Sequence, residues 1–199
     1  SIGGFVPKPH TPFQRAAQLD HESTDARLMK LRDAIRADRE YGKAIGLRYH
    51  DGKPGIVEGL LSRGDRRVGA VILQAWRDGA RFDGWSEHFS FDRWMAAADR
   101  ALAGTGVDVD WFTIRERQRT EVLPWDHLDS GLDSEWLWAD WQDALDEQAV
   151  DDCRWTPCFD CGVCDQMGTQ IQIGPTGVTQ LPLLSVPSVP AVATATAQS

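Results

Sequence analysis

Hydrophobic positions recur with the 3.6-residue period of an amphipathic helix in several parts of the chain. Polar residues that can cap a helix precede most of these stretches, and Ser90 and Asp133 stand directly before two of them. The spacing predicts one helix that Ser23 or Thr24 caps and that runs to about Asp38, then helices at Ile56–Leu61, Arg67–Trp76 and Ser90–Leu102, and one that Asp133 opens and that ends before Val150.

Two other stretches are apolar without a helical period. Residues 1–7 are typical of the end of a buried strand, which Pro7, Pro9 and Pro12 would terminate because proline fixes φ and lacks an N–H. Ala44–Tyr49 favours a second short strand that a turn over residues 51–54 closes. Residues 110–122 are ambiguous, with a strand as one alternative. Strands and helices together predict an α/β fold class.

Charge is distributed unevenly along the sequence. The formal net charge is -9, and no charged residue follows Asp165. The uncharged segment 166–199 is rich in Pro, Thr, Ser, Val and Ala, which predicts a disordered tail. The acidic balance argues against nucleic-acid binding by the whole surface, but it leaves a local basic patch open. There is no signal peptide and no apolar run near 18 residues, so we expect a cytoplasmic protein without membrane contact.

The four cysteines of the chain lie within one short segment. They form a C-x4-C-x2-C-x2-C pattern made of Cys153, Cys158, Cys161 and Cys164. In a reducing compartment, clustered thiols are more often metal ligands than disulfides. The last three share the spacing with which a bacterial ferredoxin begins its cluster loop, whereas a structural zinc site commonly uses two separated pairs. The pattern leaves an iron–sulfur cluster, a zinc ion that staples the preceding Trp-rich helix, or no stable metal as alternatives.

Two groups of arginines stand out in an acidic chain. Arg63, Arg66 and Arg67 surround Gly64 at a junction between two predicted helices, where guanidinium groups suit a phosphate or carboxylate. The alternative is a set of surface ion pairs with Asp65 and its neighbours. A second group alternates along the ambiguous segment and favours an exposed charged face; it consists of Arg115, Arg117 and Arg119.

His10 lies in a proline-rich segment directly after the first predicted strand, with Lys8 and Gln14 beside it. Strand ends are where substrate groups collect in α/β folds, so these three side chains are candidates for ligand binding. A structural role for His10 is the alternative, because no partner residue is visible in the sequence. The chain contains no Gly-rich phosphate loop, G-x-S-x-G or H-E-x-x-H motif.

Four phrases resemble the C-terminal part of radical SAM proteins that carry an N-terminal cobalamin-binding domain, often called Fe–S oxidoreductases. They are Phe-Val-Pro-Lys-Pro-His-Thr-Pro-Phe-Gln at 5–14, Ser-Arg-Gly-Asp-Arg-Arg at 62–67, Leu-Pro-Trp-Asp-His at 123–127 and the cysteine run at 153–164. The resemblance covers residues 1–165. It implies a partial TIM-like barrel whose last strand and a helix are residues 1–40, an α/β to helical extension at 41–122, and a Trp-rich helix with a cysteine metal-binding loop at 123–165.

The resemblance also implies a reaction. Such proteins use a [4Fe–4S] cluster to cleave S-adenosylmethionine reductively, and this family can bind cobalamin as well. Lys8, His10 and Gln14 would line the barrel mouth, and Arg63, Arg66 and Arg67 would contact an anionic substrate or cofactor group. The C-x3-C-x2-C motif that holds the S-adenosylmethionine cluster is absent from this sequence.

We therefore expect a C-terminal fragment that is inactive alone and whose partner is the missing N-terminal part of the same polypeptide. The four cysteines would then hold an auxiliary iron–sulfur cluster or a zinc ion. The expected substrate is a small molecule or an RNA, and DNA is not expected. The competing hypothesis is a stand-alone, zinc-stapled module that presents its arginines to RNA or to a protein partner without catalysis.

Overall fold

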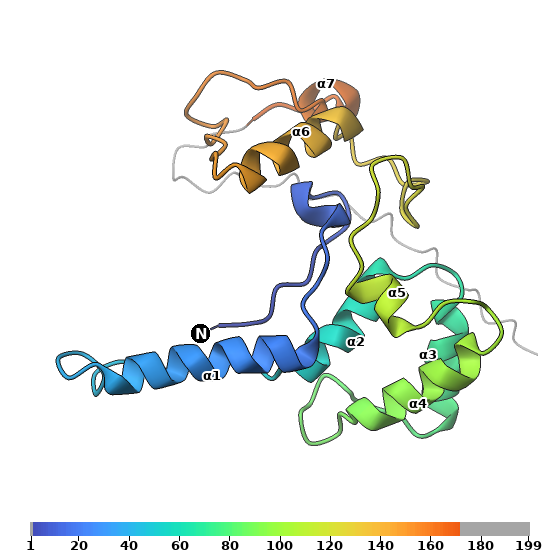
Figure 1. Cartoon of the computed structure of the whole chain (residues 1–199). Coiled ribbons are helices and arrows are strands. Elements are labelled where there is room, and N and C mark those ends of the chain that lie inside the picture. Colours follow the sequence, from blue (N-terminus) through green and yellow to red (C-terminus); the bar gives the residue numbers. More distant parts are fainter. Residues whose placement is uncertain (1, 172–199) are drawn as a thin grey trace, which may run out of the picture.

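The computed structural model describes residues 2–171, and within that range the chain is helical (Figure 1). Seven α-helices and one 3-10 helix follow one another, and no β-strand occurs among the described residues. The elements are η1 (Pro12–Arg15), α1 (His21–Ala37), α2 (Gly52–Arg63), α3 (Val68–Arg77), α4 (Phe91–Leu102), α5 (Val109–Thr113), α6 (Ser134–Leu145) and α7 (Val163–Met167). None of these helices is long and apolar enough to cross a membrane.

The predicted α/β class, with the last strand of a partial TIM-like barrel, is wrong. The two segments predicted as strands meet in a single parallel bridge between Ile2 and Tyr49, where the Ile2 N–H donates to the Arg48 carbonyl at 2.8 Å. A strand needs a ladder of such bonds, and within residues 2–171 no further strand supplies one. The apolar residues of the first segment serve packing instead, because Val6 and Pro7 are buried in a helical interior.

Most of the predicted helices are present, with shifted starts. Asp20, rather than Ser23 or Thr24, caps α1: its Oδ1 accepts the Ser23 N–H at 2.6 Å. The turn predicted over residues 51–54 is the first turn of α2, where Pro54 fits because the N–H it lacks has no partner within the helix. Ser90 and Asp133 cap α4 and α6 as predicted. The possible strand in residues 110–122 is replaced by the short helix α5 and an irregular segment.

The main hydrophobic core lies between α2, α3, α4 and α5. Helices α3 and α4 pack against each other along their lengths, and α2 and α5 close the core (Figure 1). Six of its side chains are completely buried, namely Leu60, Val71, Ala75, Ala97, Ala98 and Phe112. Helix α1 projects from this bundle, contacts it mainly through α2, and buries only Leu28. The long helix therefore receives little tertiary support beyond its first half.

A second, smaller layer lies above the bundle. Helix α6 packs on η1, with Leu137 and Trp141 buried between them and Trp125 buried nearby (Figure 1). The irregular segment 114–133 links this layer to α5. The cysteine loop and α7 complete it. Gln166 and Met167, placed at the start of the predicted tail, belong to α7, and the tail beyond residue 171 lies outside the described residues.

Candidate functional site

A buried arginine holds the N-terminal segment against the helical bundle. Arg63, at the end of α2, is completely buried, and its guanidinium donates only to main-chain carbonyls. Its Nη2 donates to Ala16 at 2.9 Å, its Nε to Phe112 at 3.3 Å and its Nη1 to Pro7 at 3.5 Å. Burial, together with the like charges of Arg117 and Arg115, lowers the pKa of Arg63 to about 10, so the group stays charged at neutral pH.

A second buried arginine lies beside the first. The Nη2 of Arg117 donates to the carbonyls of Arg63 at 2.8 Å and Phe112 at 3.2 Å, and burial lowers its pKa to about 10. Its guanidinium lies over the Trp125 ring, 5.0 Å from the ring centroid. The Trp125 Nε1 in turn donates to Gln14 Oε1 at 2.7 Å. We call Gln14, Arg63, Arg117 and Trp125 the buried polar junction.

The buried polar junction brings together three of the four phrases that carry the family resemblance. Pro7 and Gln14 come from residues 5–14, Arg63 from residues 62–67 and Trp125 from residues 123–127. Main-chain bonds between Arg117 N–H and Arg15 oxygen at 2.8 Å, and between Gln18 N–H and Thr113 oxygen at 3.1 Å, fasten the same segments. Segments more than 100 residues apart are thus joined by buried hydrogen bonds that fix their register.

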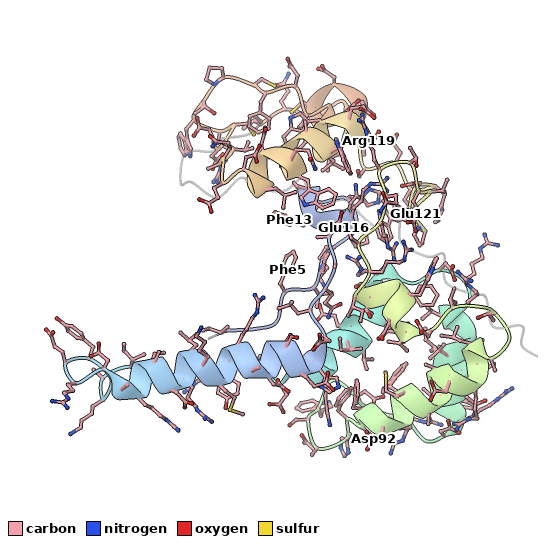
Figure 2. All side chains as sticks on the ribbon, viewed as in Figure 1. Phe5, Phe13, Asp92, Glu116, Arg119 and Glu121 are labelled. Carbon is pink, nitrogen blue, oxygen red and sulfur yellow. The ribbon has the colours of Figure 1, made fainter. Side chains whose placement is uncertain are left out.

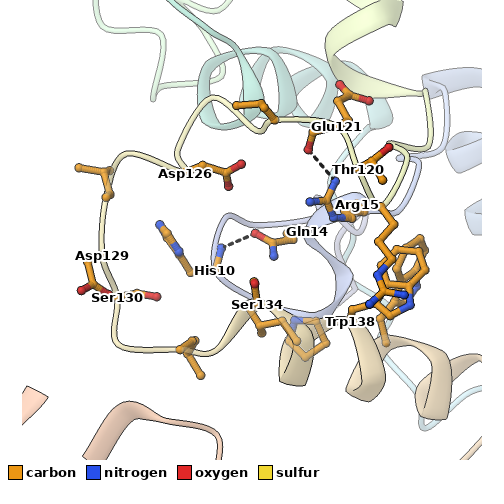
Figure 3. Close-up of a pocket in the computed structure, with 17 residues that line it drawn as sticks. His10, Gln14, Arg15, Thr120, Glu121, Asp126, Asp129, Ser130, Ser134 and Trp138 are labelled. Carbon is orange, nitrogen blue, oxygen red and sulfur yellow. Dashed lines mark hydrogen bonds between the residues drawn. The ribbon is translucent and has the colours of Figure 1, made fainter. Parts of the chain in front are cut away.

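A cavity of about 480 Å³ lies above this junction, between η1, α6 and the segment 119–134 (Figure 3). His10 and Gln14 both line it, as two of the three N-terminal candidates. The His10 N–H donates to Gln14 Oε1 at 3.1 Å, while the imidazole Nε2 is buried without a hydrogen-bond partner among the described residues. His10 adopts a left-handed backbone with φ 55°, which is uncommon outside glycine. Lys8 lies outside the cavity and pairs with Glu58.

The three arginines around Gly64 do not converge on one anion site. Arg63 is internal, and the exposed Arg66 side chain makes no hydrogen bond among the described residues. Arg67 forms an ion pair with Asp65, with its Nη2 at 2.6 Å from Oδ2, and it lies over the Trp111 ring at 5.1 Å. The hydrogen bonds from Arg67 hold the pKa of Asp65 below its usual value. The geometry matches the ion-pair alternative for Arg67 and an internal role for Arg63.

The second arginine group is also divided. Arg115 donates to both carboxylate oxygens of Glu121, at 2.7 and 2.6 Å, and Arg119 pairs with Glu135 at the start of α6. Figure 2 shows Arg119 and Glu121 on the segment that connects the bundle to α6. Arg117 is buried, so the expectation of one exposed charged face does not describe this segment. Its arginines instead hold a connection without regular secondary structure in place.

The cysteine loop keeps its four sulfurs in one region but does not gather them around a point. All four thiols are free, and within residues 2–171 no group of three or more His, Cys, Asp or Glu side chains is arranged as a metal site. Burial and the negative charges of Cys158, Cys161 and Cys153 raise the pKa of Cys164, which places the four groups within electrostatic reach of one another. Cys158 Sγ also accepts the Asp160 N–H at 3.4 Å, a bond type that suits a thiolate ligand.

The cysteine loop docks on the beginning of α6. The Asp133 N–H donates to the Cys161 carbonyl at 2.9 Å, so the residue that caps α6 is bonded to the loop. Gly162 has φ 93°, and a Cβ there would lie 2.9 Å from the Gly131 carbonyl, a contact that only glycine allows. The ring of Phe159 stacks on Trp136 with centroids 5.5 Å apart. The loop and α6 are therefore one structural unit.

Several residues of the cavity carry no signal in the sequence. Arg15, Asp129 and Trp141 line it together with the predicted His10 and Gln14. None of the three stands in a recognisable motif, and Arg15 lies more than 100 positions before the other two. Only the packing of η1 on α6 brings them to one place.

No protein-family model matches this chain, and neither a curated protein nor a solved structure matches it. The resemblance to radical SAM proteins accordingly rests on the four sequence phrases. The structure shows, in addition, that three of those phrases meet in the buried polar junction.

Proposed function

We propose that this chain is a metal-binding region of a radical SAM protein, in which Cys153, Cys158, Cys161 and Cys164 hold an auxiliary iron–sulfur cluster. The observation that carries the proposal is one loop with four free thiols, docked on α6 through the Cys161 carbonyl. Four thiolates match the ligand set of such a cluster. The cluster would supply redox or structural chemistry, while the chain positions the ligands.

The loop has the freedom to close around a metal. Residues 150–161 have no regular secondary structure, and Gly162 provides a left-handed joint directly before α7, which carries Cys164. Because these thiols are free and lie within one short segment, metal binding requires only that segment to change its conformation. Metal binding of this kind is coupled to local folding.

The family resemblance supports the wider part of the proposal. Three of the resembling phrases meet in the buried polar junction, which is consistent with one shared structural purpose. Since this sequence lacks the C-x3-C-x2-C motif, cleavage of S-adenosylmethionine would require another part of the protein. The substrate class we propose for the whole protein is a small molecule or an RNA, with cobalamin as a further cofactor outside this chain.

Zinc is the second candidate for the same four thiolates. The bond from Asp133 N–H to Cys161 oxygen favours it, because a closed tetrahedral site there would staple α6 to the loop without any redox role. A zinc-stapled module for RNA or protein binding would follow from that result.

Anaerobic reconstitution with iron and sulfide, compared with zinc loading, tests the proposal. We expect iron and sulfide to bind with a broad absorbance near about 400 nm, as thiolate-ligated clusters show. Cys161→Ser should lower the bound iron strongly, while Thr156→Ser, in the same loop but without a thiol, should retain it. One tight zinc without iron would establish the second candidate, and a chain that binds neither metal would refute both.

A further inference from the structure

The cavity between η1 and α6 has the size of a ligand site, and none of its lining residues belongs to the cysteine loop. Its volume of about 480 Å³ lies within the range of small-molecule pockets. Its walls come from η1, from the connecting segment and from α6. The buried polar junction lies beneath it, so its floor is fixed by buried hydrogen bonds.

Two buried polar groups at this cavity have no partner among the described residues. Trp141 is only 3% exposed and lines the cavity, yet its Nε1–H, which can only donate, finds no acceptor. The buried His10 Nε2 is unpaired in the same cavity. A buried polar atom without a partner costs about 1–3 kcal/mol, so two beside one cavity indicate a ligand that accepts their hydrogen bonds.

His10 is held against the cavity by a strained backbone. Its φ of 55° is unfavourable for a residue with a Cβ, and the bond from its N–H to Gln14 Oε1 at 3.1 Å helps to hold it there. Gln14 is fixed in turn by Trp125. In Figure 3 the imidazole points into the open space among the lining residues. Strain that is maintained in this way is typical of a binding residue.

Opposite charges lie on opposite sides of the cavity. Arg15 is on one side and donates to the main-chain carbonyls of Gln118 and Glu121, and it forms no side-chain ion pair among residues 2–171. Asp129 is on the other side, with one carboxylate oxygen bonded only to the Gly131 N–H at 2.8 Å. His10 lies between them (Figure 3). Of the other charged groups that line the cavity, Glu121 and Arg119 are paired with Arg115 and Glu135, and Asp126 accepts the Leu123 N–H at 2.7 Å.

We infer that this cavity binds a small zwitterion of the amino-acid type, either free or as part of a larger metabolite. The carboxylate of this ligand accepts hydrogen bonds from the side chains of Arg15, His10 and Trp141. Its ammonium group donates to the Asp129 carboxylate. In this orientation, each cavity side chain that lacks a complete set of partners meets a ligand group of complementary charge or hydrogen-bonding role. Asp126 also lines the cavity near Arg15 and adds a second negative charge to it, while burial lowers the pKa of the Arg15 guanidinium. A simple anion or a simple cation would satisfy only half of these groups.

Three matched probes test the charge requirement on the 199-residue chain. Glycylglycine carries both charges, N-acetylglycine carries only the carboxylate, and glycinamide carries only the ammonium group. The readout is the indole N–H signal of Trp141 in a ¹H–¹⁵N spectrum, assigned by its loss in Trp141→Phe. We expect a saturable shift of this signal with glycylglycine and much weaker responses with the two singly charged probes.

Asp129→Asn provides the matching change in the protein. The side chain is exposed, and asparagine keeps the acceptor for the Gly131 N–H, so the fold is retained. Loss of the charge should weaken glycylglycine binding about tenfold or more, while Asp143→Asn, on α6 outside the cavity, should leave it unchanged. The inference is overturned if glycylglycine leaves the Trp141 signal in place, if N-acetylglycine or glycinamide binds equally well, or if Asp129→Asn binds as the wild type does.

Discussion

At the scale of single residues, the charged groups of this chain serve internal structure more than its surface. Arg63 and Arg117 are buried and surrounded by carbonyl oxygens, and neither forms a salt bridge among the described residues. Because arginine is seldom buried, a sequence with Arg63 beside Arg66 and Arg67 favours an exposed basic patch. Five donors in a planar fork allow one guanidinium to bond three separate segments, which a sequence pattern does not disclose.

Arg63→Lys tests this internal role. Lysine keeps the charge but cannot reach the carbonyls of Pro7, Ala16 and Phe112 together, so acceptors are left unpaired around a buried ammonium group. We expect the free energy of unfolding to fall by about 2–4 kcal/mol in chemical denaturation. Arg66→Lys changes an exposed side chain that makes no hydrogen bond among the described residues, so the free energy of unfolding should stay within about 0.5 kcal/mol. Equal stability of the two variants would contradict the structural role of Arg63.

Some residues of the candidate sites can be predicted from the sequence, and others cannot. The cysteine cluster is visible because metal ligands need close spacing, and His10 and Gln14 are visible because they share one short proline-rich segment. Trp141 and Asp129 reach the cavity only through tertiary packing of η1 on α6. Their side chains are common types with no diagnostic spacing, so nothing local marks them.

At the scale of elements, helical periodicity predicts this chain well and short apolar runs predict it poorly. Helices α3, α4 and α6 have an apolar stripe, α4 and α6 also have a visible cap, and all three form where expected. Residues 2–7 and 44–49 have no such period, and extended conformation becomes a strand only if a neighbouring edge accepts its hydrogen bonds. The single Ile2–Tyr49 bridge shows extended segments without a sheet among the described residues.

The connecting segment between α5 and α6 depends on an ion pair, which makes its stability dependent on pH. The bidentate bonds from Arg115 lower the pKa of Glu121 below its usual value. A carboxyl whose pKa is lowered by folding stabilises the folded chain above its unfolded pKa, and this contribution is lost as the pH falls through the folded pKa.

We expect the difference in unfolding free energy between the wild type and Glu121→Gln to be constant above about pH 5 and to shrink below about pH 4. Urea denaturation across this range measures it. Glu116→Gln, on the same segment but without an ion pair among the described residues, is the control and should show no such trend. A difference that stays constant down to about pH 2.5 would contradict the assigned pair.

At the scale of the whole molecule, the chain consists of two layers that are stabilised differently. The bundle of α2 to α5 has a continuous hydrophobic core. The layer of η1, α6 and the cysteine loop has few buried apolar side chains and relies on the buried polar junction and on the docked loop. The cavity lies within this second layer, so whatever orders the loop also acts on the helix that forms one wall of the cavity.

Hydrogen exchange on the full chain, with and without bound metal, tests this division and rests on the proposed metal centre. Metal should increase the protection of peptides from residues 131–165, because the Asp133 N–H is bonded to Cys161 and Phe159 is stacked on Trp136. Peptides from α2 to α5 should not change, since none of the described residues that form or cover their core comes from the loop. The Cys161→Ser chain should show no response to metal. Protection that rises equally in both layers would mean that the chain folds as a single cooperative unit, contrary to the two-layer description.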